Sequence, residues 1–123
     1  MIPKNAIYAV AGVSANSDKY GYKVFKDLLD SGYKAYGINP KGGEILGQKI
    51  YADISNLPEK PDWLILVTQP EVSAKLAEEA IAAGIKNVWF QPGSESALAI
   101  EKCRAAGINC IANACIMIKR HEG

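Results

Sequence analysis

The chain of 123 residues is long enough for one domain with a single hydrophobic core and too short for two. It has 49% hydrophobic and 22% charged residues, a globular composition, and its formal net charge of +1 excludes a strong field toward nucleic acid or anionic membranes. No stretch is long and apolar enough for a membrane span or a secretion signal. We therefore expect a cytoplasmic protein with a small-molecule ligand, and no nucleic-acid or membrane partner.

The first predicted unit is a strand, a loop and a helix. Residues 7–11 are a nearly unbroken apolar run of strand length, which Gly12 ends. From Tyr22 onward apolar residues recur at helical spacing, and Ser31-Gly32 predict the helix end. Backbone N–H groups and the helix dipole favour a phosphate at such a loop.

This loop differs from the dinucleotide fingerprint, which places three glycines within six residues. Gly12 and Gly21 lie far apart, and none of the residues between them is glycine. We interpret the loop as a longer phosphate-binding loop, in which Ser14 supplies a hydroxyl and Lys19 a charge. An ordinary strand-to-helix turn is the alternative interpretation.

A second strand is predicted over residues 33–38, followed by the turn-forming residues 39–43. NAD-binding folds of this kind usually carry Asp or Glu at this strand end, to hold the ribose hydroxyls. Here Asn39-Pro40-Lys41 removes the carboxylate and adds a cation, which favours a phosphorylated ribose. Alternatively, Asn-Pro is only a turn and Lys41 only a solvated side chain.

The rest of the chain continues to alternate strands and helices. Residues 44–60 are predicted to connect them irregularly, with one helical turn at 54–57 capped by Asp53 or Ser55. Further strands are predicted at 62–68, 87–91 and 109–112. Helices are predicted at 70–83, with Pro70 in the first turn, and at 95–106, capped by Ser94; Gly84 and Gly107 end them. An apolar continuation at 115–118 and a mobile tail at 119–123 follow.

This alternation predicts a single α/β domain over residues 1–123: a doubly wound, Rossmann-like fold with about five parallel strands and helices on both faces. Ligands of such sheets bind beyond the carboxyl ends of the strands. Four predicted strand ends carry small, polar or proline residues: Gly12-Val13-Ser14, Asn39-Pro40-Lys41, Val67-Thr68-Gln69-Pro70 and Gln91-Pro92-Gly93. The pattern therefore indicates a nucleotide-type ligand.

The cysteines offer no metal-ligand spacing, and His121 lies in a polar tail. An odd number of cysteines without a secretion signal favours reduced thiols. We interpret Cys103, Cys110 and Cys115 as packing residues and expect no metal site.

Several short motifs in this order resemble the small bacterial CoA-binding domain proteins, relatives of the N-terminal domain of the succinyl-CoA synthetase alpha subunit. The motifs are Gly12-Val13-Ser14, Tyr20-Gly21, Gly37-Ile38-Asn39-Pro40-Lys41, Ile45-Leu46-Gly47, Val88-Trp89-Phe90-Gln91-Pro92-Gly93 and Cys115. The resemblance implies coenzyme A as the ligand. The residues it implies are Gly12, Ser14, Lys19, Tyr20 and Gly21 for the phosphate loop; Asn39, Pro40 and Lys41 for the 3′-phosphate and adenosine; Val67, Thr68 and Pro70 for the adenine or diphosphate; and Gln91 and Gly93 for the pantetheine.

The synthetase subunit has a second domain with a phosphorylated histidine, and His121 does not correspond to that residue. No carboxylate pair, Ser/His/Asp set or Cys/His pair is evident in the sequence. We therefore expect non-catalytic binding of CoA or an acyl-CoA, regulatory or carrier-like. An NAD(H)-binding module, an acyl-CoA ligase subunit, a thiol activity at Cys115 and a protein acting through oligomerisation are the alternatives; a homodimer is the commonest oligomer.

Overall fold

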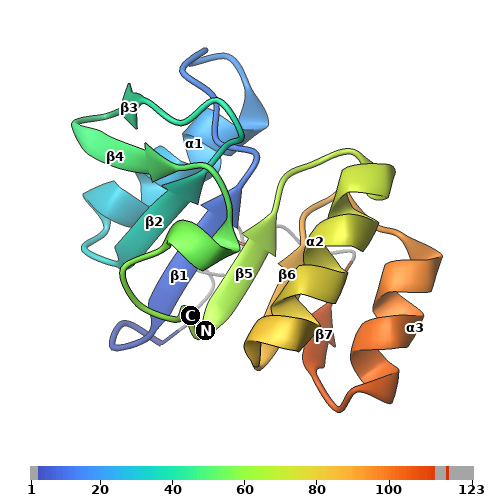
Figure 1. The fold of residues 1–123 in the computed structure, drawn as a ribbon. Helices are drawn as coiled ribbons and strands as arrows, with labels where there is room; N and C mark the ends of the chain where they lie inside the picture. The colour runs from blue at the N-terminus through green and yellow to red at the C-terminus, as the bar shows by residue number, and fades with distance from the viewer. Residues whose placement is uncertain (1–2, 113–115, 117–123) are drawn as a thin grey trace.

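The computed structural model describes residues 3–112 and 116, which form one sheet with helices on both faces (Figure 1). The strands are β1 (Ile7–Ala11), β2 (Lys34–Ile38), β3 (Glu44–Ile45), β4 (Gln48–Tyr51), β5 (Trp63–Leu66), β6 (Asn87–Phe90) and β7 (Asn109–Ile111). The helices are α1 (Tyr20–Asp30), α2 (Pro70–Ala83), α3 (Ala97–Ala105) and the 3-10 turn η1 (Ile54–Asn56). The predicted α/β class is confirmed.

The strand order β3-β4-β2-β1-β5-β6-β7 is that of a doubly wound sheet. From β1 the chain moves outward to β2 and β4, and then returns to the other side of β1 with β5, β6 and β7. All neighbouring pairs are parallel except β3 with β4. The direction of winding therefore reverses between β1 and β5, the position where such sheets bind ligands.

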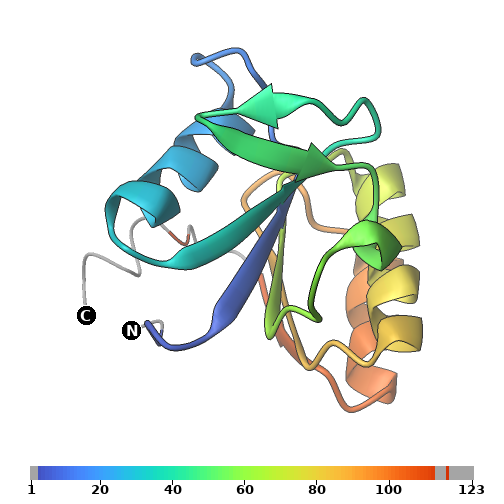
Figure 2. The same cartoon turned by 60° about the vertical axis from the view of Figure 1, so that its left-hand side comes forward.

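Alternating side chains of the central strands serve two separate cores. Tyr8 and Val10 of β1 belong to a buried cluster with Val24, Phe25 and Leu28 of α1. Ala9 and Ala11 belong to a second cluster, with Ala77 and Ala80 of α2 and Ala99 of α3. Figure 2 shows α1 on one side of the sheet and α2 with α3 on the other. Burial on both faces is the reason why β1 is a continuous apolar run.

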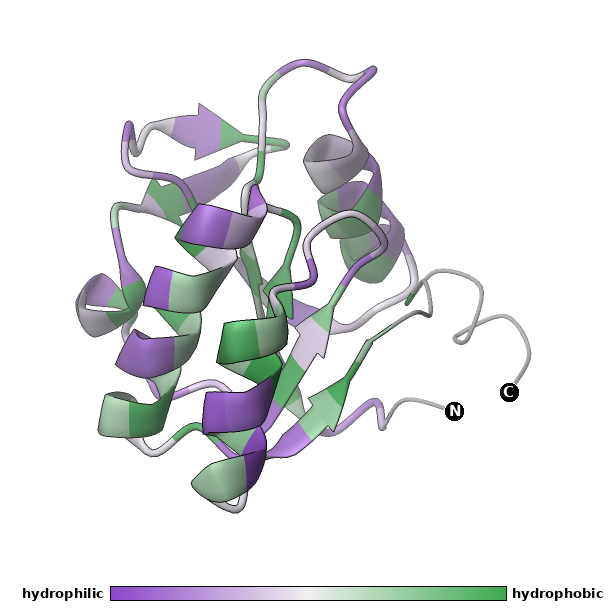
Figure 3. Cartoon of the chain, turned by 90° about the vertical axis from the view of Figure 1, so that its right-hand side faces the viewer, coloured by the Kyte–Doolittle hydropathy of each residue, from purple (hydrophilic) through white to green (hydrophobic). Residues whose placement is uncertain are grey.

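The helices on the α2 side have the expected amphipathic character. Figure 3 shows hydrophilic residues on the outer side of α2 and hydrophobic residues gathered on the strands behind the two helices. The predicted limits of α2 are confirmed: Pro70 lies in its first turn, and Gly84 ends it in the left-handed conformation with φ +78°. Glu78 of α2 forms an ion pair with Lys102 of α3, which links the two helices at their exposed sides.

The prediction for residues 44–60 was partly wrong. This stretch contains the β3–β4 hairpin, and β4 extends the parallel sheet beside β2, so the sheet has seven strands instead of about five. β3 has two residues and β4 four, of which only Ile50 is buried, so neither is long enough to show an alternating pattern. The predicted turn at residues 54–57 is confirmed as η1, and the Asp53 carboxylate caps it by accepting from Asn56 N–H.

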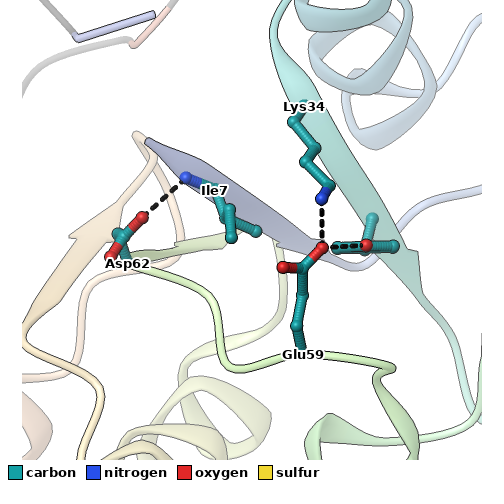
Figure 4. Close-up of polar contacts among 5 residues, drawn as sticks. Ile7, Lys34, Glu59 and Asp62 are labelled. Carbon is teal, nitrogen blue, oxygen red and sulfur yellow. Dashed lines mark hydrogen bonds and ion pairs between the residues drawn. The ribbon is translucent and has the colours of Figure 1, made fainter. Parts of the chain in front are cut away.

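The segment between β4 and β5 crosses the sheet without a long helix, and Glu59 fastens it to β2. Its carboxylate pairs with Lys34 and accepts from the Tyr36 hydroxyl (Figure 4). The hydrogen bond from Lys34, with a second from Tyr36, lowers the pKa of Glu59, and the same contact raises the pKa of Lys34. Asp62 fastens the end of the segment, accepting from Ile7 N–H at 2.7 Å.

The predicted cap of α3 was wrong. Ser96 is the capping residue: its backbone is extended and its hydroxyl accepts from Ala99 N–H at 3.2 Å, so the helix begins at Ala97. Ser94 is buried two residues earlier, and its Oγ accepts from Thr68 N–H at 3.1 Å. Ser94 therefore joins two loops of the sheet edge instead of starting a helix.

The predictions for Cys115, His121 and the tail 119–123 lie outside the described residues. Cys103 is fully buried in the α3 core, which confirms its packing role, and burial raises the pKa of both Cys103 and Cys110. Across residues 3–112 and 116, no three His, Cys, Asp or Glu side chains gather as a metal site. Within the same ranges no helix has the length and apolar character needed to cross a bilayer.

Candidate functional site

Two glycines allow the closest approach of chain segments where β1 ends. Gly12 has a φ of +95°, and a Cβ at this position would lie 2.0 Å from the carbonyl oxygen of Val67. A Cβ on Gly21 of α1 would lie 2.1 Å from the carbonyl oxygen of Gly12. Only glycine fits at either position. These contacts bring the end of β1, the end of β5 and the start of α1 together at the switch point.

Asn39, directly after β2, connects two loops through its side chain. Its Nδ2 donates to the carbonyl oxygen of Val13 at 2.7 Å, and its Oδ1 accepts from Lys41 N–H at 2.9 Å. An amide can make both bonds because it carries a donor and an acceptor, whereas a carboxylate is an acceptor only. The absence of an acidic residue at this strand end therefore has a structural reason in addition to any preference for a ligand.

The loop before α1 is ordered by its own side chains. Ser14 Oγ accepts from Asn16 N–H at 3.1 Å, and Asn16 Oδ1 accepts from Asp18 N–H at 3.0 Å. Such side-chain turns hold short loops in one conformation. The hydroxyl proton of Ser14 has no acceptor among residues 3–112 and 116, so it is free to be donated to a ligand oxygen.

On the other side of the switch point, Thr68 joins the loops that follow β5 and β6. Its N–H donates to Ser94 Oγ, and its hydroxyl lies 2.6 Å from the hydroxyl of the buried Ser73 in α2. Gly93 N–H donates to Glu95 Oε1 at 2.8 Å. The Thr68 hydroxyl is therefore already hydrogen-bonded within the protein. These hydrogen bonds hold the loops after β5 and β6 in a fixed conformation at the edge of the sheet.

Three hollows open along this edge of the sheet. The β2-side hollow, of about 340 Å³, is lined by residues including Ser14, Asn16, Asn39, Lys41, Glu44 and Ile45. The central hollow, of about 310 Å³, is lined by residues including Gly12, Pro40, Asp53, Thr68, Val72 and Glu79. The β6-side hollow, of about 420 Å³, is lined by residues including Tyr20, Val67, Thr68, Gln69, Val72 and Gly93. Thr68 and Val72 belong to two of them, so the central and β6-side hollows adjoin.

The fold brings most of the predicted site residues to this edge. Nine of the thirteen line the three hollows: Gly12, Ser14, Tyr20, Asn39, Pro40, Lys41, Val67, Thr68 and Gly93. Gly21 is buried behind Gly12, Lys19 is the exposed residue just before α1, and Pro70 lies in the first turn of α2. Gln91 is fully buried, and its Oε1 accepts from Ile116 N–H at 2.9 Å.

Helix α2 contributes to the candidate site, although its sequence pattern does not indicate this. Val72, Lys75, Leu76 and Glu79 of this helix line the central hollow. The amphipathic pattern of residues 70–83 predicts Lys75 and Glu79 on the solvent side of the helix and Val72 and Leu76 on its apolar side. An amphipathic pattern separates these residues into two faces, but it does not show that the border between the faces lies over a ligand site.

A sequence model of the CoA binding domain matches residues 6–121 of the chain. The chain belongs to the CoA-binding domain family. The resemblance inferred from its motifs is thereby confirmed at the level of the family, and the match extends over both sides of the switch point.

Relatives of this CoA-binding domain include small proteins and parts of large enzymes. A conserved hypothetical protein from Pyrococcus furiosus has the same fold with a TM-score of 0.88 and 38% identity, over 93% of this chain and 98% of that one. The uncharacterized protein YneT of Bacillus subtilis is 26% identical over 110 residues, 89% of this chain and 82% of YneT. The alpha subunit of the ADP-forming acetate–CoA ligase I of P. furiosus is 36% identical over 86 residues. This match covers 65% of the present chain but 19% of the ligase subunit.

Proposed function

We propose that this CoA-binding domain binds coenzyme A or an acyl-CoA along the carboxyl edge of its sheet. The observation that carries the proposal is the gathering of nine predicted binding residues around three hollows at the reversal of strand order. Membership of the CoA-binding domain family supports the same ligand.

The chemistry of the edge suits the parts of CoA. Phosphates are favoured at the loop before α1, where the hydroxyl proton of Ser14 has no acceptor among the described residues. Lys41 supplies a positive charge in the same β2-side hollow. Among the described residues, those that line the β6-side hollow are uncharged, which suits the uncharged pantetheine arm. In the β2-side hollow Asn39 holds the turn that carries Lys41.

We further propose that the domain binds its ligand without transforming it, as a regulatory or carrier protein. The Thr68 hydroxyl is already paired with Ser73, and burial raises the pKa of Cys103 and Cys110. Raised thiol pKa values disfavour the thiolate that nucleophilic catalysis requires.

Isothermal titration calorimetry with CoA, 3′-dephospho-CoA and NADH tests the binding. We expect CoA to bind more tightly than either of the other two, because each lacks the 3′-phosphate. Lys41→Ala should weaken CoA binding by about tenfold, the loss of one charge-assisted contact. Lys86→Ala, which removes an exposed lysine from the opposite edge of the sheet, should leave it unchanged. No heat of binding with CoA, or equal affinity for NADH, would contradict the proposal.

A second candidate function is that of the CoA-binding part of an acyl-CoA ligase. The 36% identity to a ligase alpha subunit favours it, although the match spans a small part of that subunit. The purified chain should then show ADP-forming ligase activity once the other ligase domains from the same genome are added, including the phosphohistidine domain and the ATP-binding subunit. Light scattering on the separate and mixed proteins would report the complex, and would also show whether the chain alone is a homodimer. Absence of both a complex and activity would leave the non-catalytic proposal.

A further inference from the structure

The central hollow adjoins a larger hollow of about 660 Å³ between η1 and α2. Asp53 and Glu79 line both hollows, so these two carboxylates stand at their common boundary. Figures 1 and 2 show η1 and α2 side by side on the same face of the sheet, where a long crossover helix is replaced by the short η1 segment. The central hollow is therefore a slot that opens at the switch point and meets the larger hollow at two acidic residues.

The walls of this slot are mainly apolar. Pro40, after β2, contributes one wall, and Val72 and Leu76 of α2 contribute another. Val72 is 46% exposed, among the most exposed large hydrophobic residues of the described chain. A flat ring inserted here would cover this apolar surface, which favours a heteroaromatic ligand group.

The two carboxylates of the slot, those of Asp53 and Glu79, differ in their hydrogen bonding within the protein. Asp53 Oδ1 accepts from the Ser55 hydroxyl at 2.6 Å and from Asn56 N–H at 3.2 Å, so it is used as the cap of η1. Glu79 is half-buried, and within residues 3–112 and 116 its carboxylate makes no hydrogen bond or ion pair. Glu79 is thus the carboxylate available to a ligand. An ionised carboxylate accepts hydrogen bonds only.

We propose that the central hollow holds the adenine ring of the nucleotide and that Glu79 accepts a hydrogen bond from its exocyclic amine. The inference rests on the proposed binding of CoA and adds the residue that selects the base. Hypoxanthine carries a carbonyl oxygen in place of the amine, and this oxygen would face the Glu79 carboxylate. Acceptor facing acceptor is repulsive, so the site discriminates between the two bases. Lys75 also lines the hollow.

The test compares CoA with its deaminated analogue, in which hypoxanthine replaces adenine, by calorimetry on three proteins. The native protein should bind CoA at least about tenfold more tightly than the analogue. Glu79→Gln should lose this preference, because its side-chain amide can donate to the carbonyl of hypoxanthine. Glu78→Gln is the matched control. Glu78 is the sequence neighbour of Glu79, but it pairs with Lys102 of α3 instead of lining the hollow. The preference of this variant for adenine should stay at the native value.

The outcomes separate this inference from the proposed function. If the native protein binds CoA and the deaminated analogue with equal affinity, Glu79 does not select the base. The same conclusion follows if Glu79→Gln keeps the native preference for CoA. Either result overturns only this inference. If neither compound binds the native protein, both the inference and the proposed function are overturned. If Glu79 had only a structural role, Glu79→Gln would weaken the binding of both compounds equally. The ratio of the two affinities would then stay at its native value.

Discussion

The side-chain amide of Asn39 donates to the carbonyl oxygen of Val13 across 2.7 Å, joining loops that are 26 residues apart in the sequence. The two loops follow β1 and β2, and both line the β2-side hollow. One hydrogen bond thus sets the distance between the phosphate-loop candidate Ser14 and the turn that carries Lys41. The candidate site depends on this bond for its shape.

Replacing Asn39 by Asp should open the site. A carboxylate cannot donate to Val13 and would repel its carbonyl oxygen, so we expect the free energy of unfolding to fall by about 1–3 kcal/mol at pH 7. CoA binding should weaken about three- to tenfold, roughly the loss expected when a loop contact shifts. Chemical denaturation and calorimetry measure the two effects.

Asn87→Asp is the matched control for that substitution. Asn87 also donates from its amide to a carbonyl, that of Asp62 at 2.8 Å, but at the opposite edge of the sheet. It should lower stability to a similar degree without changing CoA affinity. Equal loss of affinity in both variants would show that Asn39 acts through stability alone.

Gly12→Ala should be among the most destabilising single substitutions in this chain. The new Cβ would lie 2.0 Å from Val67 O and would occupy a residue with φ +95°, so we expect a loss of at least about 3 kcal/mol. Gly32→Ala separates the two causes, because Gly32 has φ +83° with no atom within 4 Å of a Cβ. It should cost about 1–2 kcal/mol, the penalty of the left-handed conformation. Urea unfolding of both variants checks the difference, and equal losses would contradict the role of the Val67 contact.

Leu46→Asn should stabilise the protein. Leu46 and Gly47 form the tip of the β3–β4 hairpin with φ of +54° and +74°, a turn in which Asn is favoured at the first position and a leucine is strained. Leu46 is 37% exposed, so little burial is lost. We expect a gain of about 0.5–1 kcal/mol by thermal unfolding. Leu46→Ala removes the side chain without favouring this conformation and should not give the gain; a loss with Asn would disprove the strain.

Glu59→Gln should change how the melting temperature depends on pH. Hydrogen bonds from Lys34 and Tyr36 lower the pKa of Glu59 from its ordinary value of 4.5, so the native state favours the ionised form. The stabilisation is present above about pH 4.5 and is lost as the pH falls through the lowered pKa. The variant should therefore melt below the native protein at pH 7, and the two curves should converge in acid. A difference that stays constant from pH 7 to pH 3 would show that the ionised form is not the one that stabilises the fold. Because the Glu59 side chain is partly exposed, the effect should also shrink with added salt.

Local patterns in the sequence were sufficient to predict the main elements and the edge of the sheet where most of the candidate residues lie. Burial of single elements is visible in the apolar runs of β1 and β5 and in the apolar stripe of α2. The glycine at position 84 indicates the backbone conformation that ends α2. Because parallel strands end at a common edge, the polar strand ends could be assigned to one site before any contact was known. The strands β3 and β4 could not be predicted in this way, because they have too few residues to show an alternating pattern.

Hydrophobic periodicity and glycine or proline signals act over a few neighbouring residues, so the amino-acid sequence is enough to predict the doubly wound fold and the edge proposed for the ligand. Which side chains meet at that edge depends on contacts between distant segments. The tertiary structure joins Asn39 to Val13 and Ser94 to Thr68, and it sets Glu79 of α2 at the border of two hollows. These contacts join residues that are far apart in the sequence, and they exist only after strand pairing has fixed which loops and helix faces are neighbours.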